Sequence, residues 1–190
     1  MKSPFAGMIA AAALLLLAGS HAASAPNKEL PFTDFETLVL VQSASLFDFP
    51  VFQVEIFSDG RVRHSGPTFE QTGGPHEARV DRRGLMQIAR ALRDARVDEM
   101  RDRYQDAADG CESTMTDLHT LSLRVNRGGG AHDKVVVLYA GCLGPTVPTG
   151  RIDALSKAID QVTGTGTLLA QREQARRAEG EARKAARGAR

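Results

Sequence analysis

The chain has 190 residues, of which 24 are Lys or Arg and 23 are Asp or Glu, so its formal net charge is +1. Proteins that bind nucleic acid through its phosphates carry a clear basic excess, so we expect no nucleic-acid partner here. The sequence has no Trp and only two Tyr, and therefore lacks the side chains of an aromatic sugar-binding platform.

Residues 1–22 have the three zones of a secretory signal peptide. Lys2 gives a positive start, residues 5–18 form an uncharged apolar run, and small residues follow. The run is too short for a comfortable bilayer span, and Ser20 stands where a lipoprotein signal requires its lipidated Cys. We therefore expect cleavage after Ala22 and a periplasmic or secreted chain that has no transmembrane segment and no lipid anchor.

Three segments after a linker over residues 23–34 predict strands. Residues 35–42 are apolar on both faces in their middle, which is typical of a well-covered strand. Residues 51–57 alternate apolar and polar side chains, and residues 61–66 continue as a partner strand after a Ser-Asp-Gly turn. These segments predict a β-hairpin beside a covered strand.

The turn of this hairpin decides its register. A two-residue turn would set Ile56 opposite Arg63. A three-residue turn with Gly60 in the left-handed conformation sets Ile56 opposite Val62 and Glu55 opposite Arg63. The second register pairs apolar with apolar and joins opposite charges, and each such pair contributes about 0.2–1 kcal/mol. We expect the three-residue turn.

A loop, a short edge strand and a helix come next. Residues 67–75 contain Gly and Pro and predict a loop, and residues 76–80 predict the edge strand. Asp81 is expected to cap a helix that runs to about Val97. Its apolar stripe at helical spacing consists of Leu85, Ile88, Ala89 and Leu92.

A second hairpin and a second helix follow a polar stretch. Residues 121–125 alternate, whereas residues 134–140 are largely apolar on both faces and predict a central strand. We expect Asn126 to pair with Lys134. The helix over residues 151–162 is expected to bury Ile152, Leu155 and Ile159. Residues 35–163 thus predict one α+β domain, a four- to five-stranded, largely antiparallel sheet with two helices packed on one face.

Residues 164–190 form a charged tail rich in Ala, Arg and Glu, with seven basic and three acidic residues between Ala170 and Arg190. Helix propensity is high but no apolar stripe is present, so a solvated helix or a disordered tail is expected. Truncation after Gly166 should then leave the melting temperature almost unchanged. The basic excess suits a weak contact with anionic envelope surfaces.

The two cysteines, Cys111 and Cys142, are expected to form a disulfide. An even number of cysteines in an exported protein favours a bridge over a metal or redox pair. The hairpin between them returns the chain to its starting edge, which brings the two residues near each other. Two free buried thiols are the alternative.

Short motifs are spread from the first strand to the second helix: Pro50-Val51-Phe52, Ser58-Asp59-Gly60-Arg61-Val62, Gly66, Tyr104, Cys111, Thr116-Asp117, Gly141-Cys142 and Ile159-Asp160. Over residues 35–162 this pattern resembles a family of exported bacterial domains of unknown function. The resemblance implies a mixed α+β fold and a periplasmic or secreted setting, and it implies no activity. That family often has two cysteines before the Pro-x-aromatic step, where residues 43–49 here have none.

Catalytic signatures such as G-x-S-x-G, H-E-x-x-H and C-x-x-C are missing from the sequence, so we expect no catalytic residue, metal or cofactor. One arrangement remains as a candidate site. His64 has the parity of the buried strand face, and Asp117 and His119 share the parity of Leu121. A carboxylate that orients imidazoles is part of many general-base and metal sites. In the alternative, each His is half-buried at a strand end and Thr116-Asp117 is turn chemistry.

The function expected from these patterns is a non-catalytic binding or accessory module of the cell envelope. One alternative is a small metal-dependent or hydrolase-like activity around His64, Asp117 and His119. The other is an inhibitor or envelope-interaction protein that acts through the loops at residues 43–50 and 67–75.

Overall fold

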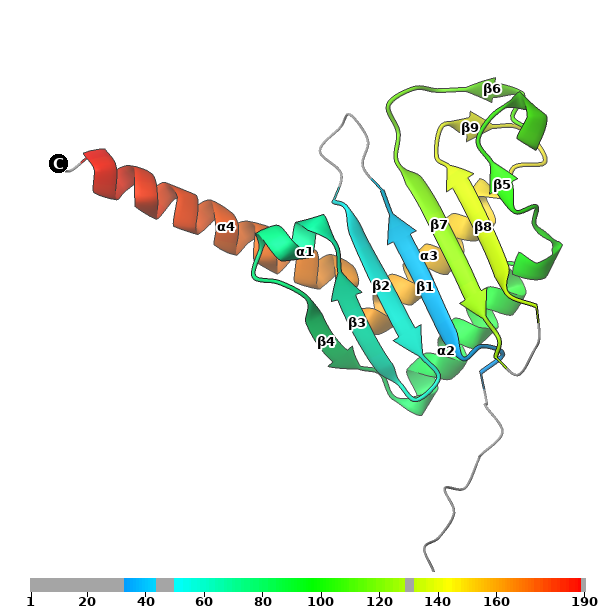
Figure 1. Ribbon diagram of the computed structural model, residues 1–190, viewed down its shortest axis with the longest axis horizontal. Coiled ribbons are helices and arrows are strands. Elements are labelled where there is room, and N and C mark those ends of the chain that lie inside the picture. Colours follow the sequence, from blue (N-terminus) through cyan, green and yellow to red (C-terminus); the bar gives the residue numbers. More distant parts are fainter. Residues whose placement is uncertain (1–32, 44–49, 129–131, 189–190) are drawn as a thin grey trace, which may run out of the picture.

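The computed structural model describes residues 33–43, 50–128 and 132–188 (Figure 1). The expected signal peptide, nearly all of the expected linker and residues 44–49 of the first loop lie outside the described residues. Within these ranges no helix combines the length and the apolar character that a membrane span needs.

The centre of the fold is a seven-stranded sheet with the order β4-β3-β2-β1-β7-β8-β5. All neighbouring strands are antiparallel except β5 and β8, which are parallel. The strands are β1 (Thr37–Gln42), β2 (Phe52–Phe57), β3 (Arg61–Ser65), β4 (His76–Arg79), β5 (Arg103–Tyr104), β7 (Thr120–Asn126) and β8 (Lys134–Tyr139). A separate two-stranded sheet joins β6 (Ser113–Thr114) to β9 (Cys142–Leu143).

The mixed α+β class is confirmed, but four to five strands and two helices understate the fold. The strands β5, β6 and β9 have two residues each, which is too short for any alternation to be visible in the sequence. The helix α1 (Pro67–Gln71) lies where a loop was expected. Its Pro stands in the first turn, where a missing backbone N–H costs no helical hydrogen bond.

The first hairpin has the expected register. Ile56 lies opposite Val62 and Glu55 opposite Arg63, and Gly60 has a φ of 87°. The three-residue turn is therefore confirmed, and β4 forms the sheet edge as expected.

The expected register of the second hairpin was wrong by one residue. Val125, not Asn126, lies opposite Lys134, so Leu123 faces Val136. Both faces of β8 are apolar, so a shift by one residue still pairs apolar side chains and the pattern cannot select the register. β8 has a partner on each side, as expected of a covered strand, and lies one place in from the edge that the two-residue β5 forms.

Two helices cover one face of the sheet, α2 (Arg82–Asp94) and α3 (Thr149–Thr163) (Figure 1). Asp81 caps α2 by accepting a hydrogen bond from the backbone of Gly84 at 2.8 Å. A Cβ at Gly84 would stand 2.8 Å from Val162, so the missing side chain lets the two helices approach. The apolar stripes of both helices are buried as expected. Two 3-10 turns, η1 (Val97–Glu99) and η2 (Ala107–Asp109), lead away from α2.

Cys111 and Cys142 form the expected disulfide, and both residues are buried in the core. The bridge joins β9 to the polar segment before β6 across a sequence separation of 31. Closing a loop of that length contributes about 3–4 kcal/mol where the entropy of the unfolded chain dominates.

The tail forms the helix α4 (Thr165–Gly188), whose first turns pack on the domain while the rest projects away from it (Figure 1). The Arg172 guanidinium donates hydrogen bonds to the backbone oxygens of Phe69 and Thr72 at 3.3 Å and of Gly74 at 2.5 Å. It also lies 5.0 Å from the centre of the Phe69 ring. The expectation that the tail has nothing to pack against is therefore wrong for its first turns.

A chain of hydrogen bonds ties the start of α4 to the fully buried His64 on β3. The Thr163 hydroxyl donates to the Ile159 backbone oxygen, so the Thr165 hydroxyl must donate to Thr163 in their 2.7 Å contact. Thr165 then accepts from His64 Nε2, which lies 3.0 Å away. This order fixes the neutral imidazole with its proton on Nε2.

The neutral form of His64 is also favoured by its surroundings. Burial lowers the pKa of His64, as do the positive charges of His76 and Arg172, while a backbone hydrogen bond with His76 opposes the shift. The ring centres of His64 and His76 are 5.8 Å apart. Protonation of His64 would therefore place a poorly solvated charge near the Arg172 guanidinium.

Two truncations test the packing of α4. Ending the chain after Gly166 removes the three Arg172 hydrogen bonds and should cost about 1–3 kcal/mol, because the donor is charged and the acceptors are partly buried. Ending it after Arg177 keeps these contacts and should leave the melting temperature unchanged. Thermal unfolding of both variants checks this, and equal melting temperatures would contradict it.

The state of His64 makes stability pH-dependent. The folded pKa lies below the unfolded value of about 6.5, so the contribution is complete above that pH and is lost as pH falls toward the folded pKa. We expect the melting temperature to fall over this window less steeply in His64→Gln than in the native chain. Because the pKa of His119 is also lowered by burial, His119→Gln serves as the parallel measurement. An unchanged slope in His64→Gln would contradict the assignment.

Candidate functional site

The three residues of the sequence-based candidate site lie in different surroundings. His64 is on β3, and His119 directly precedes β7. β2 and β1 lie between these strands, which separates their axes by three strand spacings, about 14 Å. The two histidines therefore belong to strands that are not neighbours, and the described residues contain no group of three His, Cys, Asp or Glu side chains that could hold a metal ion.

Asp117 lies in the turn before β7. Its φ is 68°, and its side chain accepts a hydrogen bond from the Thr116 hydroxyl at 3.1 Å. A non-glycine residue with positive φ is most often Asn or Asp, because their short polar side chains bond to the local backbone. The positive φ places Asp117 in a turn, and its hydrogen bond with Thr116 joins two side chains rather than a side chain and a backbone N–H.

His119, in contrast, lines a groove between the sheet and the helices. The groove has a volume of about 730 Å³ and lies where β1 ends, β2 and β7 begin, and α3 gives way to α4. We name it the α3–α4 groove. Its apolar lining consists of Leu40, Pro50, Phe52, Val54, Leu121, Ala154, Ile159 and Leu169, and its polar lining of Gln42, His119, Asp153, Ser156, Lys157, Asp160 and Thr165.

The sheet residues of the groove reach it by strand alternation. Leu40, Val54 and Leu121 share the face that packs against the helices, and Leu40 is opposite Val54 across β1 and β2. On the other side, α3 presents two residues in each successive turn: Asp153 and Ala154, Ser156 and Lys157, and Ile159 and Asp160. The groove therefore continues the hydrophobic core outward to the surface.

Ser156 is the unusual residue of this groove. Its Oγ is buried and has no hydrogen-bond partner among the residues that the structure describes. Buried hydroxyls in native proteins nearly always have a partner, in the protein or in bound water or ligand. A hydroxyl at the groove wall with unused bonding capacity can hold a polar atom of a bound molecule.

Charge surrounds the groove only at its rim. Asp153 and Lys157 are exposed residues one turn apart on α3, and Asp160 accepts a hydrogen bond from the Gly166 backbone at 2.5 Å. Burial lowers the pKa of His119, although the Asp153 charge opposes the shift. The groove thus offers a neutral imidazole, a hydroxyl, a carboxylate and an ammonium around an apolar floor.

Sequence reasoning found His119 but missed Ser156 and Lys157. The stripe of Ile152, Leu155 and Ile159 marked α3 as a core helix, and Ser156 falls within that stripe, four residues after Ile152. A hydroxyl at a core position of an amphipathic helix was the signal that could have revealed it. Lys157 carries no such signal, because a Lys beside the stripe is ordinary.

Comparison with curated proteins gives no match to this chain. A family model, described as a domain of unknown function (DUF6438), matches residues 36–163. The matched range runs from the residue before β1 to the end of α3, and so includes the sheet, the disulfide and most of the α3–α4 groove. The chain belongs to this family, the domain of unknown function DUF6438.

Proposed function

We propose that this domain is a non-catalytic binding module of the cell envelope and that the α3–α4 groove takes a small ligand with an apolar body and a polar head. One observation carries the proposal: an apolar groove of about 730 Å³ contains a buried serine hydroxyl without a partner among the described residues. That volume lies within the range of about 300–1,000 Å³ usual for small-molecule sites.

The lining indicates the class of ligand. The apolar floor would bury a chain or ring, since each buried CH₂ contributes about 0.8 kcal/mol. Asp153 and Lys157 are of opposite sign and stand one helical turn apart, so the rim favours a neutral or zwitterionic head over a strongly charged one. Ser156 would bind the polar atom nearest the floor.

The envelope setting rests on two further observations. The disulfide is buried and intact, and such bridges persist mainly in oxidising compartments. The pattern of residues 1–22 is that of a secretory signal. The hydrolase-like alternative has less support, because His64 is engaged with Thr165 and lies three strands away from His119.

A neutral hydrophobic probe, N-phenyl-1-naphthylamine, tests the groove. Ala154 lines the groove on α3, and Ala178 is exposed on the projecting part of α4. Ala154→Trp should fill the groove and weaken probe binding by at least about tenfold, whereas Ala178→Trp should leave it unchanged. Fluorescence titration of the full chain measures both.

A second variant, Ser156→Ala, tests whether the serine hydroxyl contributes to the stability of the free protein. Ser156→Ala removes an unpaired buried hydroxyl, so the free protein should keep or raise its melting temperature. Probe binding that is equal in native, Ala154→Trp and Ala178→Trp chains would overturn the groove as the binding site.

A further inference from the structure

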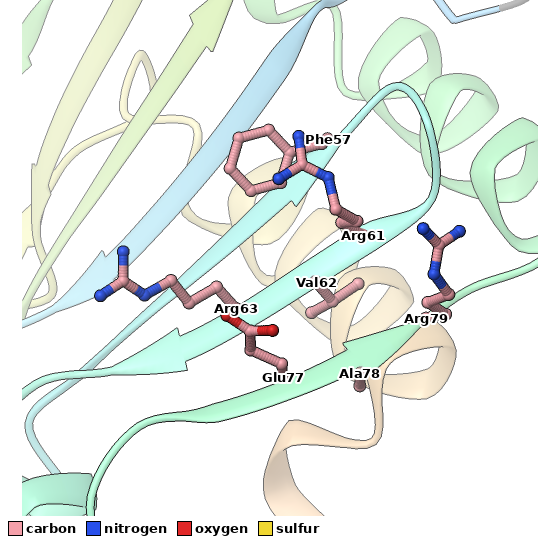
Figure 2. Close-up of a pocket in the computed structure, with 7 residues that line it drawn as sticks. All are labelled: Phe57, Arg61, Val62, Arg63, Glu77, Ala78 and Arg79. Carbon is pink, nitrogen blue, oxygen red and sulfur yellow. The ribbon is translucent and has the colours of Figure 1, made fainter.

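The open face of the sheet carries a second hollow, on the side away from α2 and α3. Figure 2 shows its side chains, which come from the end of β2, from β3 and from β4. The hollow has a volume of about 530 Å³ and is lined by Phe57, Arg61, Val62, Arg63, Glu77, Ala78 and Arg79. It shares no lining residue with the α3–α4 groove, and we name it the arginine hollow.

The register of β3 and β4 places two like charges directly opposite each other. Arg61 pairs with Arg79 across the strands, whereas Arg63 pairs with Glu77 and, on its other side, with Glu55. Like charges directly opposite are destabilising in an antiparallel pair. In this register Arg63 faces a carboxylate on each side, whereas Arg61 and Arg79 face each other.

Arg61 is held in place before any ligand arrives. Its Nε donates to Asp59 at 2.7 Å, and its guanidinium carbon lies 4.3 Å from the centre of the Phe57 ring (Figure 2). These contacts use one face of the guanidinium and one of its five N–H groups, and they leave the terminal Nη groups available. A fixed fork loses less entropy on binding than a mobile side chain does.

Asp59 is the ion-pair partner that holds the Arg61 guanidinium. Its pKa is lowered first by the hydrogen bond from the Arg61 backbone N–H, and then by the charges of Arg61 and Arg79, while partial burial opposes the shift. Asp59 therefore remains ionised at neutral pH, and its single charge acts on both guanidiniums while its ion pair is formed with Arg61. In the described part of the chain, Arg63 and Arg79 form no ion pair.

We propose that the arginine hollow binds an oxyanion, a phosphate or carboxylate group, between Arg61 and Arg79. Guanidinium groups pair with both anions through two parallel hydrogen bonds. The anion would relieve the repulsion between the paired arginines, and Glu77 at the other end of the hollow would repel a second one. The site therefore takes a single anionic group rather than a polyanion.

Titrations with inorganic phosphate and with acetate, each at low and constant ionic strength, test this site. The Nε–H resonances of arginine side chains in the full chain are followed by NMR, with sodium chloride as the reference salt. Saturable shifts at Arg61 and Arg79 are expected. Tighter binding of phosphate would identify a phosphate-bearing ligand, and tighter binding of acetate a carboxylate. Shifts no larger than those caused by chloride would overturn the proposal.

Two variants are expected to change anion binding in opposite directions, a result that misfolding would not produce. Arg79→Gln should weaken binding by at least about tenfold, because it removes a charged donor, and Glu77→Gln should strengthen it. Arg83, an exposed arginine on α2, supplies the matched control, since Arg83→Gln should leave binding unchanged. Phosphate should raise the melting temperature of the native chain but not that of Arg79→Gln. Equal weakening in Arg79→Gln and Arg83→Gln would overturn the site.

Discussion

One-sided burial of the sheet determines where the accessible parts of this protein lie. Seven strands span six spacings, about 29 Å, whereas two helices side by side cover only about 20–24 Å. α2 and α3 therefore cannot cover the whole apolar face, and the first turns of α4 close part of the remainder. The α3–α4 groove lies where α3 meets the first turns of α4, and residues of both α3 and α4 line it.

His64 links α4 to the sheet. The alternation of β3 puts a polar ring at a position with 0% exposure, and a buried imidazole needs a hydrogen-bond partner. α4 supplies that partner through Thr165, which is also a lining residue of the groove. The same contact that satisfies a buried histidine thus positions one wall of the groove. Groove shape and the protonation state of His64 are consequently not independent.

Sequence patterns predicted those parts of the fold in which one face differs chemically from the other. The first hairpin has one apolar and one polar face, so its register followed from pairing alone. β8 is apolar on both faces, so the register with β7 did not. The docking of α4 escaped prediction because it depends on single contacts from Arg172 and Thr165 rather than on an apolar stripe. Ser156 and Arg79 could not be predicted as site residues for the same reason, because only the tertiary structure shows what lies next to each of them.

The two sites also follow from strand alternation, which sends adjacent residues of one strand to opposite sides of the sheet. Val54 and Ile56 on β2 face the helices, and Val54 reaches the groove, while Phe57 faces the arginine hollow. The sheet separates the sites, so one small ligand cannot occupy both. Their chemistry differs accordingly: the groove is apolar with charges of both signs at its rim, and the hollow has two arginines opposite each other. A neutral probe therefore tests binding in the groove, and an inorganic anion tests binding in the hollow. A negative result at one site does not contradict the proposal for the other.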